Sequence, residues 1–193
     1  MIKGILFAGV GGDGIITASN IVAAALMNAG FDVKKSEIHG MSQRGGSVTA
    51  TVRFGKKVYS PTEKLGNASF LFATEKVEAL RSIPYLNHQS VAIVNDRVVP
   101  IVNQTIDEDY IDKNIDSLTI GKLIKRRFLD DALKIGNSRV ANTIMIGVLA
   151  KFIDVDETHF FDAIEQVLPQ KLRTINVSAF SYGLKLASDL QER

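Results

Sequence analysis

Two segments near the start of the chain carry the residues best suited to ligand binding or chemistry. The first is a glycine cluster that contains Gly9, Gly11, Gly12 and Gly14, between an apolar run and an apolar helix. Glycine lets the backbone turn sharply and approach a ligand closely, and the first N–H groups of a helix attract an anion. This spacing is typical of a turn that binds a phosphate or a dinucleotide.

The same glycines also fit a tight strand-to-helix turn that binds no ligand. Asp13 places a carboxylate inside the turn, where it can cap the helix N–H groups and repel a phosphate. Glu37 lies near the distance expected for an acid that binds a ribose hydroxyl, but it belongs to the second segment. A bound dinucleotide is therefore the less favoured of the two interpretations.

The second segment, Ser36–Gly46, combines donors of several kinds. His39 can gain or lose a proton near neutral pH, and Arg44 offers a planar fork for a carboxylate or a phosphate. The other members of this candidate substrate or partner loop are Ser36, Glu37, Gly40, Met41, Gln43, Gly45 and Gly46. We predict a flexible loop beyond the carboxyl end of a strand, where ligands bind in open parallel sheets. A surface ion pair of Arg44 and a backbone hydrogen bond of His39 are the structural alternatives.

Composition limits what the chain can do alone. The sequence has no Cys, which excludes disulfides, thiolate nucleophiles and cysteine-ligated clusters within it, and its three widely spaced His do not predict a metal site. The net charge of +2 does not favour nucleic acid or a membrane surface as a partner. No apolar run reaches the roughly 20 residues of a membrane span, and the start lacks the layout of a secretion signal. We therefore expect a cytoplasmic protein.

The elements that position these residues predict an α/β fold. Residues 2–8 have the pattern of a buried strand, 15–29 that of a helix, and 31–37 that of a second strand. Together they predict a βαβ unit with parallel strands. Residues 47–54 alternate between apolar and polar, which predicts a hairpin with residues 58–60.

Further strands and helices complete the predicted architecture. Strands are expected at 70–73 and 91–94, and helices at 75–86, 123–135, 140–153, 160–168 and 177–190. We therefore predict a single domain over residues 1–193, with a mostly parallel Rossmann-like sheet, a hairpin extension and a helical C-terminal layer.

Residues 9–15 together with 36–46 resemble the gamma-type domain of the 2-oxoacid:ferredoxin oxidoreductases (the pyruvate/ketoisovalerate oxidoreductase gamma type). Within that family, the small beta subunits of indolepyruvate ferredoxin oxidoreductases are especially similar. The likeness continues through residues 58–61, through Gly136-Asn137 with Asn142, and through residues 176–183, so it covers most of the chain. The family usually has Gln where this chain has Asp13, which keeps the turn but disfavours a phosphate contact there.

The resemblance implies a division of labour between two subunits. In this family a large partner subunit carries thiamine diphosphate, Mg²⁺ and 4Fe–4S clusters. The thiamine carbanion attacks the 2-oxo acid, carbon dioxide leaves, electrons pass to ferredoxin, and coenzyme A accepts the acyl group. This chain would hold none of these cofactors, and its loop would lie at the mouth of the partner's active site, with Arg44 and His39 facing substrate or coenzyme A.

Two other functions stay open at this point. A free-standing dinucleotide-binding oxidoreductase would bind a nucleotide without any partner. A non-catalytic module would stabilise the large subunit without touching substrate. The sequence also leaves open whether the isolated chain forms a homodimer.

Overall fold

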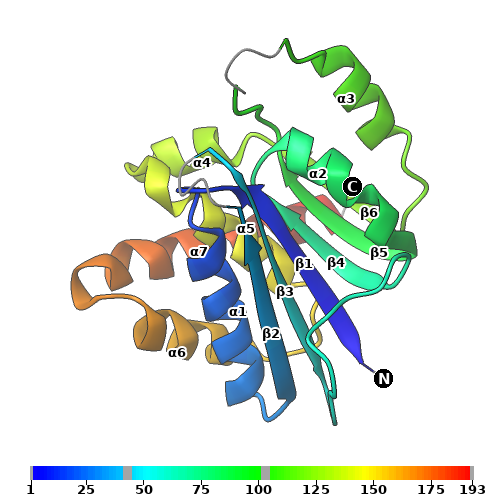
Figure 1. Ribbon diagram of the computed structural model, residues 1–193. Coiled ribbons are helices and arrows are strands. Elements are labelled where there is room, and N and C mark those ends of the chain that lie inside the picture. The colour runs from blue at the N-terminus through cyan, green and yellow to red at the C-terminus, as the bar shows by residue number, and fades with distance from the viewer. Residues whose placement is uncertain (1, 41–44, 101–104, 192–193) are drawn as a thin grey trace.

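A computed structural model describes residues 2–40, 45–100 and 105–191, and it shows a six-stranded sheet between two layers of helices (Figure 1). The strand order is β2-β3-β1-β4-β5-β6. Strands β1, β4, β5 and β6 run parallel, whereas β3 is antiparallel to both of its neighbours. The strands are β1 (Lys3–Val10), β2 (Asp32–His39), β3 (Ser47–Gly55), β4 (Ala68–Ala73), β5 (Leu86–Asn95) and β6 (Lys122–Arg126). The predicted α/β class with a mostly parallel sheet is confirmed.

The helices cover both faces of this sheet, unequally (Figure 1). The larger layer contains α1 (Ile15–Asn28), α4 (Phe128–Ile135), α5 (Ala141–Ala150), α6 (Thr158–Val167) and α7 (Gln170–Gln191). The smaller layer contains α2 (Lys76–Ser82) and α3 (Glu108–Asp116). Two short 3₁₀ helices, η1 (Ile83–Tyr85) and η2 (Ser138–Val140), complete the described elements. The helical C-terminal layer therefore lies on the same face as α1.

Alternate residues of β1 pack into the hydrophobic cores on the two faces of the sheet. Ile5 and Phe7 join the core formed with α1, α5 and α7, while Leu6 and Ala8 join the core formed with Ala79 of α2. All five side chains are buried. A strand that is buried on both faces has a continuous apolar sequence, which is why this strand was predictable.

Strand β3 changes the predicted arrangement of the N-terminal half. β1 and β2 point the same way, as a βαβ unit requires, but β3 lies between them, and Val48 is opposite both Gly9 and His39. The predicted hairpin partner was wrong: residues 58–60 form no strand, and β2 is the partner of β3. Val58 N instead donates to Asp32 Oδ2 at 2.8 Å. The alternating pattern of β3 suits any antiparallel neighbour, and β2 provides a longer ladder than three residues can.

The predicted helix over residues 123–135 is two elements, β6 and α4. Ile124 is buried and lies opposite Ile93 of β5, while Lys122 and Lys125 flank it on an edge strand. Lysine is common on edge strands because it discourages pairing with other chains. The helical pattern of α4 begins only at Phe128, and the prediction extended it backwards into the strand. Helix α7 also starts earlier than predicted, at Gln170.

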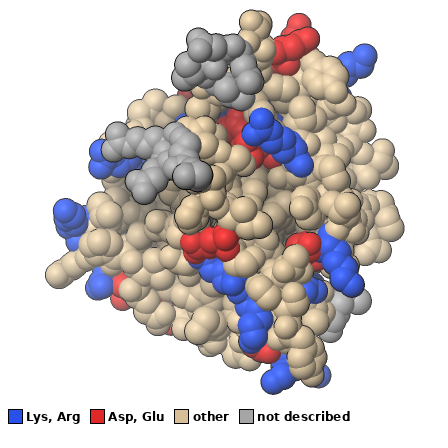
Figure 2. All heavy atoms as spheres, viewed as in Figure 1, with Lys and Arg blue, Asp and Glu red and all other residues tan. Residues whose placement is uncertain are grey.

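Charged side chains are scattered over the face that carries β1 and α2. Figure 2 shows acidic and basic groups interspersed there, with uncharged surface between them. This distribution agrees with the small net charge of +2. Within the described residues, no helix has both the length and the apolar character needed to cross a bilayer.

Candidate functional site

The two segments singled out in the sequence meet at the carboxyl ends of β1 and β2. Gly11 N donates to Gly46 O at 2.8 Å, and Gly45 N donates to Gly11 O at 3.2 Å. A cavity of about 440 Å³ beside these bonds is lined by the glycine turn, by the start of α1, and by His39 and Gly40. The glycine turn and the second segment therefore form one surface at one edge of the sheet.

The second segment is a loop only in part. Ser36, Glu37 and His39 belong to β2, so the predicted strand 31–37 continues two residues further than expected, to His39. Successive strand residues point to opposite faces, and Ser36 lies opposite Thr51 while Glu37 lies opposite Ala50. The ladder with β3 thus separates side chains that the sequence placed together.

The remaining candidates flank or fall within residues 41–44. Met41, Gln43 and Arg44 lie outside the described residues, so their proposed roles stay predictions. Gly45 has a φ of +73°, in the left-handed region that glycine adopts easily. Gly40, Gly45 and Gly46 therefore mark the two ends of the segment that would carry Arg44.

Glu37 is engaged within the fold. Its carboxylate pairs with Lys35 Nζ at 2.5 Å, and Lys35 also donates to Asn20 of α1. These contacts attach β2 to α1. They favour a structural role for Glu37 over the binding of a ribose.

Packing and backbone geometry explain the glycine spacing in the turn. A Cβ atom on Gly9 would lie 2.1 Å from Thr74 Oγ1 and 2.7 Å from Ile15 Cδ1, so a side chain does not fit there. Gly12 and Gly14 have φ values of +101° and +78°. The turn needs these glycines whether or not it binds a ligand.

Asp13 does not cap α1, contrary to the prediction. Helix α1 begins after Gly14 without any side-chain cap, and the Asp13 carboxylate instead accepts hydrogen bonds from Thr74 Oγ1 (3.2 Å) and from Arg97. Arg97 Nε also donates to Thr74 O at 2.9 Å, and Asn142 Nδ2 donates to Asp13 O at 2.6 Å. These contacts fix the glycine turn from β4, β5 and α5.

The Asp13–Arg97 ion pair lies where a nucleotide would bind in a doubly wound sheet. Strands β1 and β4 are neighbours, but α1 and α2 leave them toward opposite faces, which makes this point the crevice that usually receives the ligand. Here the chain's own ion pair bridges the residues that follow β1 and β5. This arrangement disfavours the dinucleotide interpretation.

Three positioning residues were missed in the sequence: Thr74, Arg97 and Glu78. Glu78 is buried on α2, and its carboxylate accepts from Ser47 Oγ at 2.6 Å and pairs with Arg81 at 2.5 Å. Ser47 directly follows Gly46, so this bond anchors one end of the second segment. Polar residues directly after β4 and β5 were the available signal for Thr74 and Arg97.

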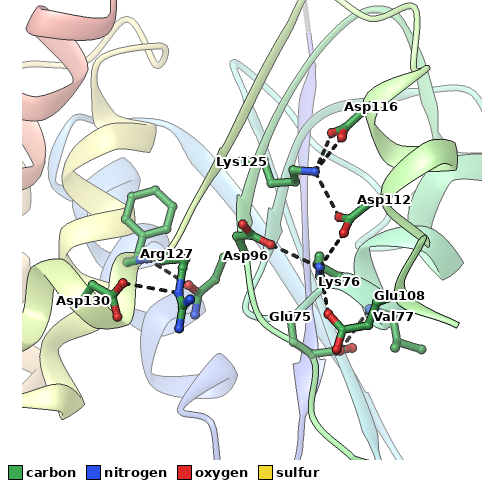
Figure 3. A network of polar contacts seen from close by, with 12 residues as sticks. Glu75, Lys76, Val77, Asp96, Glu108, Asp112, Asp116, Lys125, Arg127 and Asp130 are labelled. Atoms are coloured by element: carbon green, nitrogen blue, oxygen red, sulfur yellow. Dashed lines mark hydrogen bonds and ion pairs between the residues drawn. The ribbon is translucent and has the colours of Figure 1, made fainter. Parts of the chain in front are cut away.

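A separate ionic network attaches α3 to α2 and to the end of β5 (Figure 3). Lys76 Nζ lies 2.9 Å from Asp112 and 3.3 Å from both Asp96 and Glu108, and only 5% of its side chain is exposed. Burial alone would lower the pKa of Lys76, but the three carboxylates outweigh it and raise the pKa above its usual value. Within the described residues, no group of three or more His, Cys, Asp or Glu side chains could hold a metal ion.

The chain matches known proteins over almost its full length. The family model described as pyruvate ferredoxin/flavodoxin oxidoreductase matches residues 4–186. The indolepyruvate oxidoreductase subunit IorB of Thermococcus kodakarensis is 35% identical over 196 residues, and that of Pyrococcus horikoshii is 34% identical over 194 residues. Each alignment covers 96% of both chains.

Solved structures share the fold at lower identity. The gamma subunit of a keto/oxoacid ferredoxin oxidoreductase from Geobacter sulfurreducens has a TM-score of 0.74 at 20% identity, covering 97% of this chain and 99% of that one. A 2-oxoglutarate:ferredoxin oxidoreductase from Magnetococcus marinus has a TM-score of 0.77 at 19% identity, and this chain spans 31% of its length. The family match and the identity to the IorB proteins show that this chain belongs to the pyruvate ferredoxin/flavodoxin oxidoreductase family, as a subunit of an oxidoreductase.

Proposed function

We propose that this chain is the small subunit of a cytoplasmic, thiamine diphosphate-dependent oxidoreductase that converts an aryl 2-oxo acid, indolepyruvate foremost, into its acyl-CoA. The identity of about a third to the IorB proteins supports this substrate class. The observation that carries the proposal is the backbone pairing of Gly11 with Gly45 and Gly46, which joins both family motifs into one edge. In this proposal residues 1–193 act as one gamma-type domain.

The cofactors belong to a large catalytic partner subunit in this proposal. Thiamine diphosphate with Mg²⁺ supplies the carbon nucleophile there, 4Fe–4S clusters lead electrons to ferredoxin, and coenzyme A is the co-substrate. The absence of Cys from this sequence supports that assignment, because the clusters need thiolate ligands. The small subunit then contributes the surface that faces the partner's active site.

Arg44 and His39 are the residues that we propose to face substrate or coenzyme A. His39 is exposed at the end of β2 and lines the 440 Å³ cavity. After Arg44, the chain is held at Gly46 by a hydrogen bond from Gly11 and at Ser47 by a hydrogen bond to Glu78. A loop with a fixed base loses less conformational entropy when it binds, which favours precise placement of Arg44.

The test is Arg44→Ala in the reconstituted two-subunit complex. Loss of a charge-assisted contact with an anionic substrate is expected to lower turnover about tenfold or more. Size-exclusion chromatography should show unchanged assembly. Arg127→Ala is the matched control, because that side chain, directly before α4, is 69% exposed and outside the cavity. Normal turnover of the Arg44→Ala complex at normal assembly would contradict the proposed role and favour a purely stabilising subunit.

The free-standing oxidoreductase makes a different prediction for the isolated chain. It requires stoichiometric binding of a nucleotide without a partner, whereas the Asp13–Arg97 pair leads us to expect none at the glycine turn. Thermal-shift titration with nicotinamide and flavin nucleotides separates the two. A saturable rise in melting temperature with either nucleotide would favour the free-standing enzyme.

A further inference from the structure

A second and larger cavity lies on the other side of the glycine turn, among helices α1, α5 and α7. Its volume is about 570 Å³, within the range of roughly 300–1,000 Å³ typical of small-molecule sites. It shares only Gly12 and Gly14 with the cavity beside His39. It is therefore a separate place at which the chain could receive a ligand.

About half of the surface that lines this cavity is apolar. Its walls include Ala18, Ile21, Ile146, Leu168, Leu172 and Ile175. Two polar side chains of the lining have partners within the fold: Thr143 Oγ1 donates to Asn176 Oδ1 at 2.5 Å, and Asn176 Nδ2 donates to Leu172 O at 2.8 Å. The apolar part of the lining thus suits the apolar body of a ligand better than a charged or strongly polar group.

The mouth of the cavity is polar and carries one unmatched positive charge. Asp13 and Arg97 line it as an ion pair, so their charges cancel. Arg139 also lines it, is exposed, and forms no ion pair with any carboxylate of the described residues. Helix α1 begins at this mouth without a side-chain cap, and its first N–H groups add partial positive charge.

We propose that this cavity binds a small organic monocarboxylate. The apolar body would lie between α1, α5 and α7, and the carboxylate would lie at the mouth, where Arg139 and the first N–H groups of α1 donate to it. The charge of Arg139 suits a monoanion better than a phosphate monoester, which carries a second negative charge. This inference does not depend on the proposed enzymatic function.

The first test measures ligand binding to the isolated full-length chain by calorimetry. We expect saturable one-to-one binding of 4-phenylbutyrate. Its neutral analogue 4-phenylbutyramide should bind about tenfold more weakly, because it lacks the charge-assisted contact with Arg139. Adenosine monophosphate, the phosphate-bearing comparison, should bind more weakly than 4-phenylbutyrate.

The second test measures ligand binding to two variants in which a lining residue is replaced. Arg139→Gln should weaken 4-phenylbutyrate about tenfold and leave the amide unchanged. Leu172→Trp should fill the cavity and weaken both ligands. The matched controls are Arg127→Gln and Met27→Trp, which change exposed residues outside the cavity and should leave binding unaffected.

Several outcomes would overturn the proposal. These are no saturable binding, equal affinity for the acid and the amide, tighter binding of adenosine monophosphate, or binding that neither lining variant changes. Arg139 is exposed, so its replacement leaves the core intact and gives a decisive result even if Leu172→Trp does not fold. Circular dichroism melting of every variant checks its folding.

Discussion

Asp13 holds the glycine turn through contacts with three segments that are far apart in sequence. Thr74 follows β4, Arg97 follows β5, and Asn142 lies at the start of α5, yet all three donate hydrogen bonds to Asp13. The side chains of Asp13 and Arg97 are 19% and 32% exposed, so water screens their interaction only partly. In the sequence, Asp13 suggested a helix cap or a charge that repels a phosphate. In the structure, it links the residues that follow β4 and β5 to the start of α5.

Asp13→Ala should therefore lower the free energy of unfolding by about 1–3 kcal/mol, because it removes a charge-assisted bond and leaves Arg97 without its partner. Urea denaturation of the isolated chain measures this change. Asp130→Ala is the control, since that carboxylate pairs with Arg127 at 3.3 Å on the surface, where such pairs contribute about 0–1 kcal/mol. An equal decrease in unfolding free energy for the two variants would argue against a stabilising role of the Asp13 contacts.

Helices α5 and α7 cross with their backbones in direct contact. A Cβ atom on Gly147 would lie 2.3 Å from Phe180 O, and one on Gly183 would lie 2.1 Å from Ile144 O. Neither glycine ends a helix, and both lie in helix interiors where glycine is normally unfavourable. The close crossing, and not a backbone turn, explains them.

Gly183→Ala should destabilise the chain by about 1–3 kcal/mol through overpacking, although alanine is the better helix former by about 1 kcal/mol. Ser178→Ala on the exposed side of α7 is the control and should change stability by no more than about 0.5 kcal/mol. Thermal and chemical unfolding of both variants measure the difference. A more stable Gly183→Ala variant would show that the helices can separate at little cost.

The network around Lys76 predicts a pH dependence for the attachment of α3. Burial alone would raise the pKa of Asp112, but hydrogen bonds from Lys76 and Lys125 outweigh it and lower the pKa below its usual 3.8. A lowered carboxyl pKa stabilises the fold above its unfolded value, and this contribution is lost as the pH falls through the folded value. The pKa of Lys76 is raised above its usual 10.5, so this side chain stays charged throughout the acidic and neutral range.

The free energy of unfolding should therefore decrease as the pH drops below about 4. Asp112→Asn should make that decrease smaller. Burial raises the pKa of Glu75, which acts in the opposite direction because its contribution weakens as the pH rises above 4.5. Comparing the Asp112→Asn variant with the wild type at each pH cancels this opposing contribution. Urea unfolding between pH 3 and 7 measures the difference, and parallel curves would contradict the prediction.

Sequence reasoning found the elements whose patterns are local and missed those decided by distant partners. The strand at β1 and the helix at α1 followed from their own apolar spacing. The partner of β3 could not be predicted in this way, because it depends on which neighbour offers the longer ladder. Strand β6 could not be predicted either, because it depends on the free edge of β5. The candidate site divides in the same way: both motifs were found, but Thr74, Arg97 and Glu78 join it only through tertiary contacts.

For the whole molecule, the proposed division of labour makes a direct prediction about activity. The isolated chain should neither oxidise a 2-oxo acid nor reduce a nicotinamide, because the proposal assigns thiamine diphosphate and the clusters to the large subunit. Adding the large subunit should restore electron transfer to ferredoxin. Spectrophotometric assays of the small subunit alone, the large subunit alone and their mixture measure this. Turnover by the small subunit alone would contradict the proposal.

Strands β2 and β3 follow one another in the chain and pair antiparallel, with the rest of the second segment of the sequence between them. Eight facing residue pairs fix their register, from His39–Val48 to Asp32–Gly55. Substitutions between two strands leave such a register in place, since connections tolerate changes that strands do not. Reactivity could therefore be retuned here, during evolution or by design, with the hydrophobic core left unaltered.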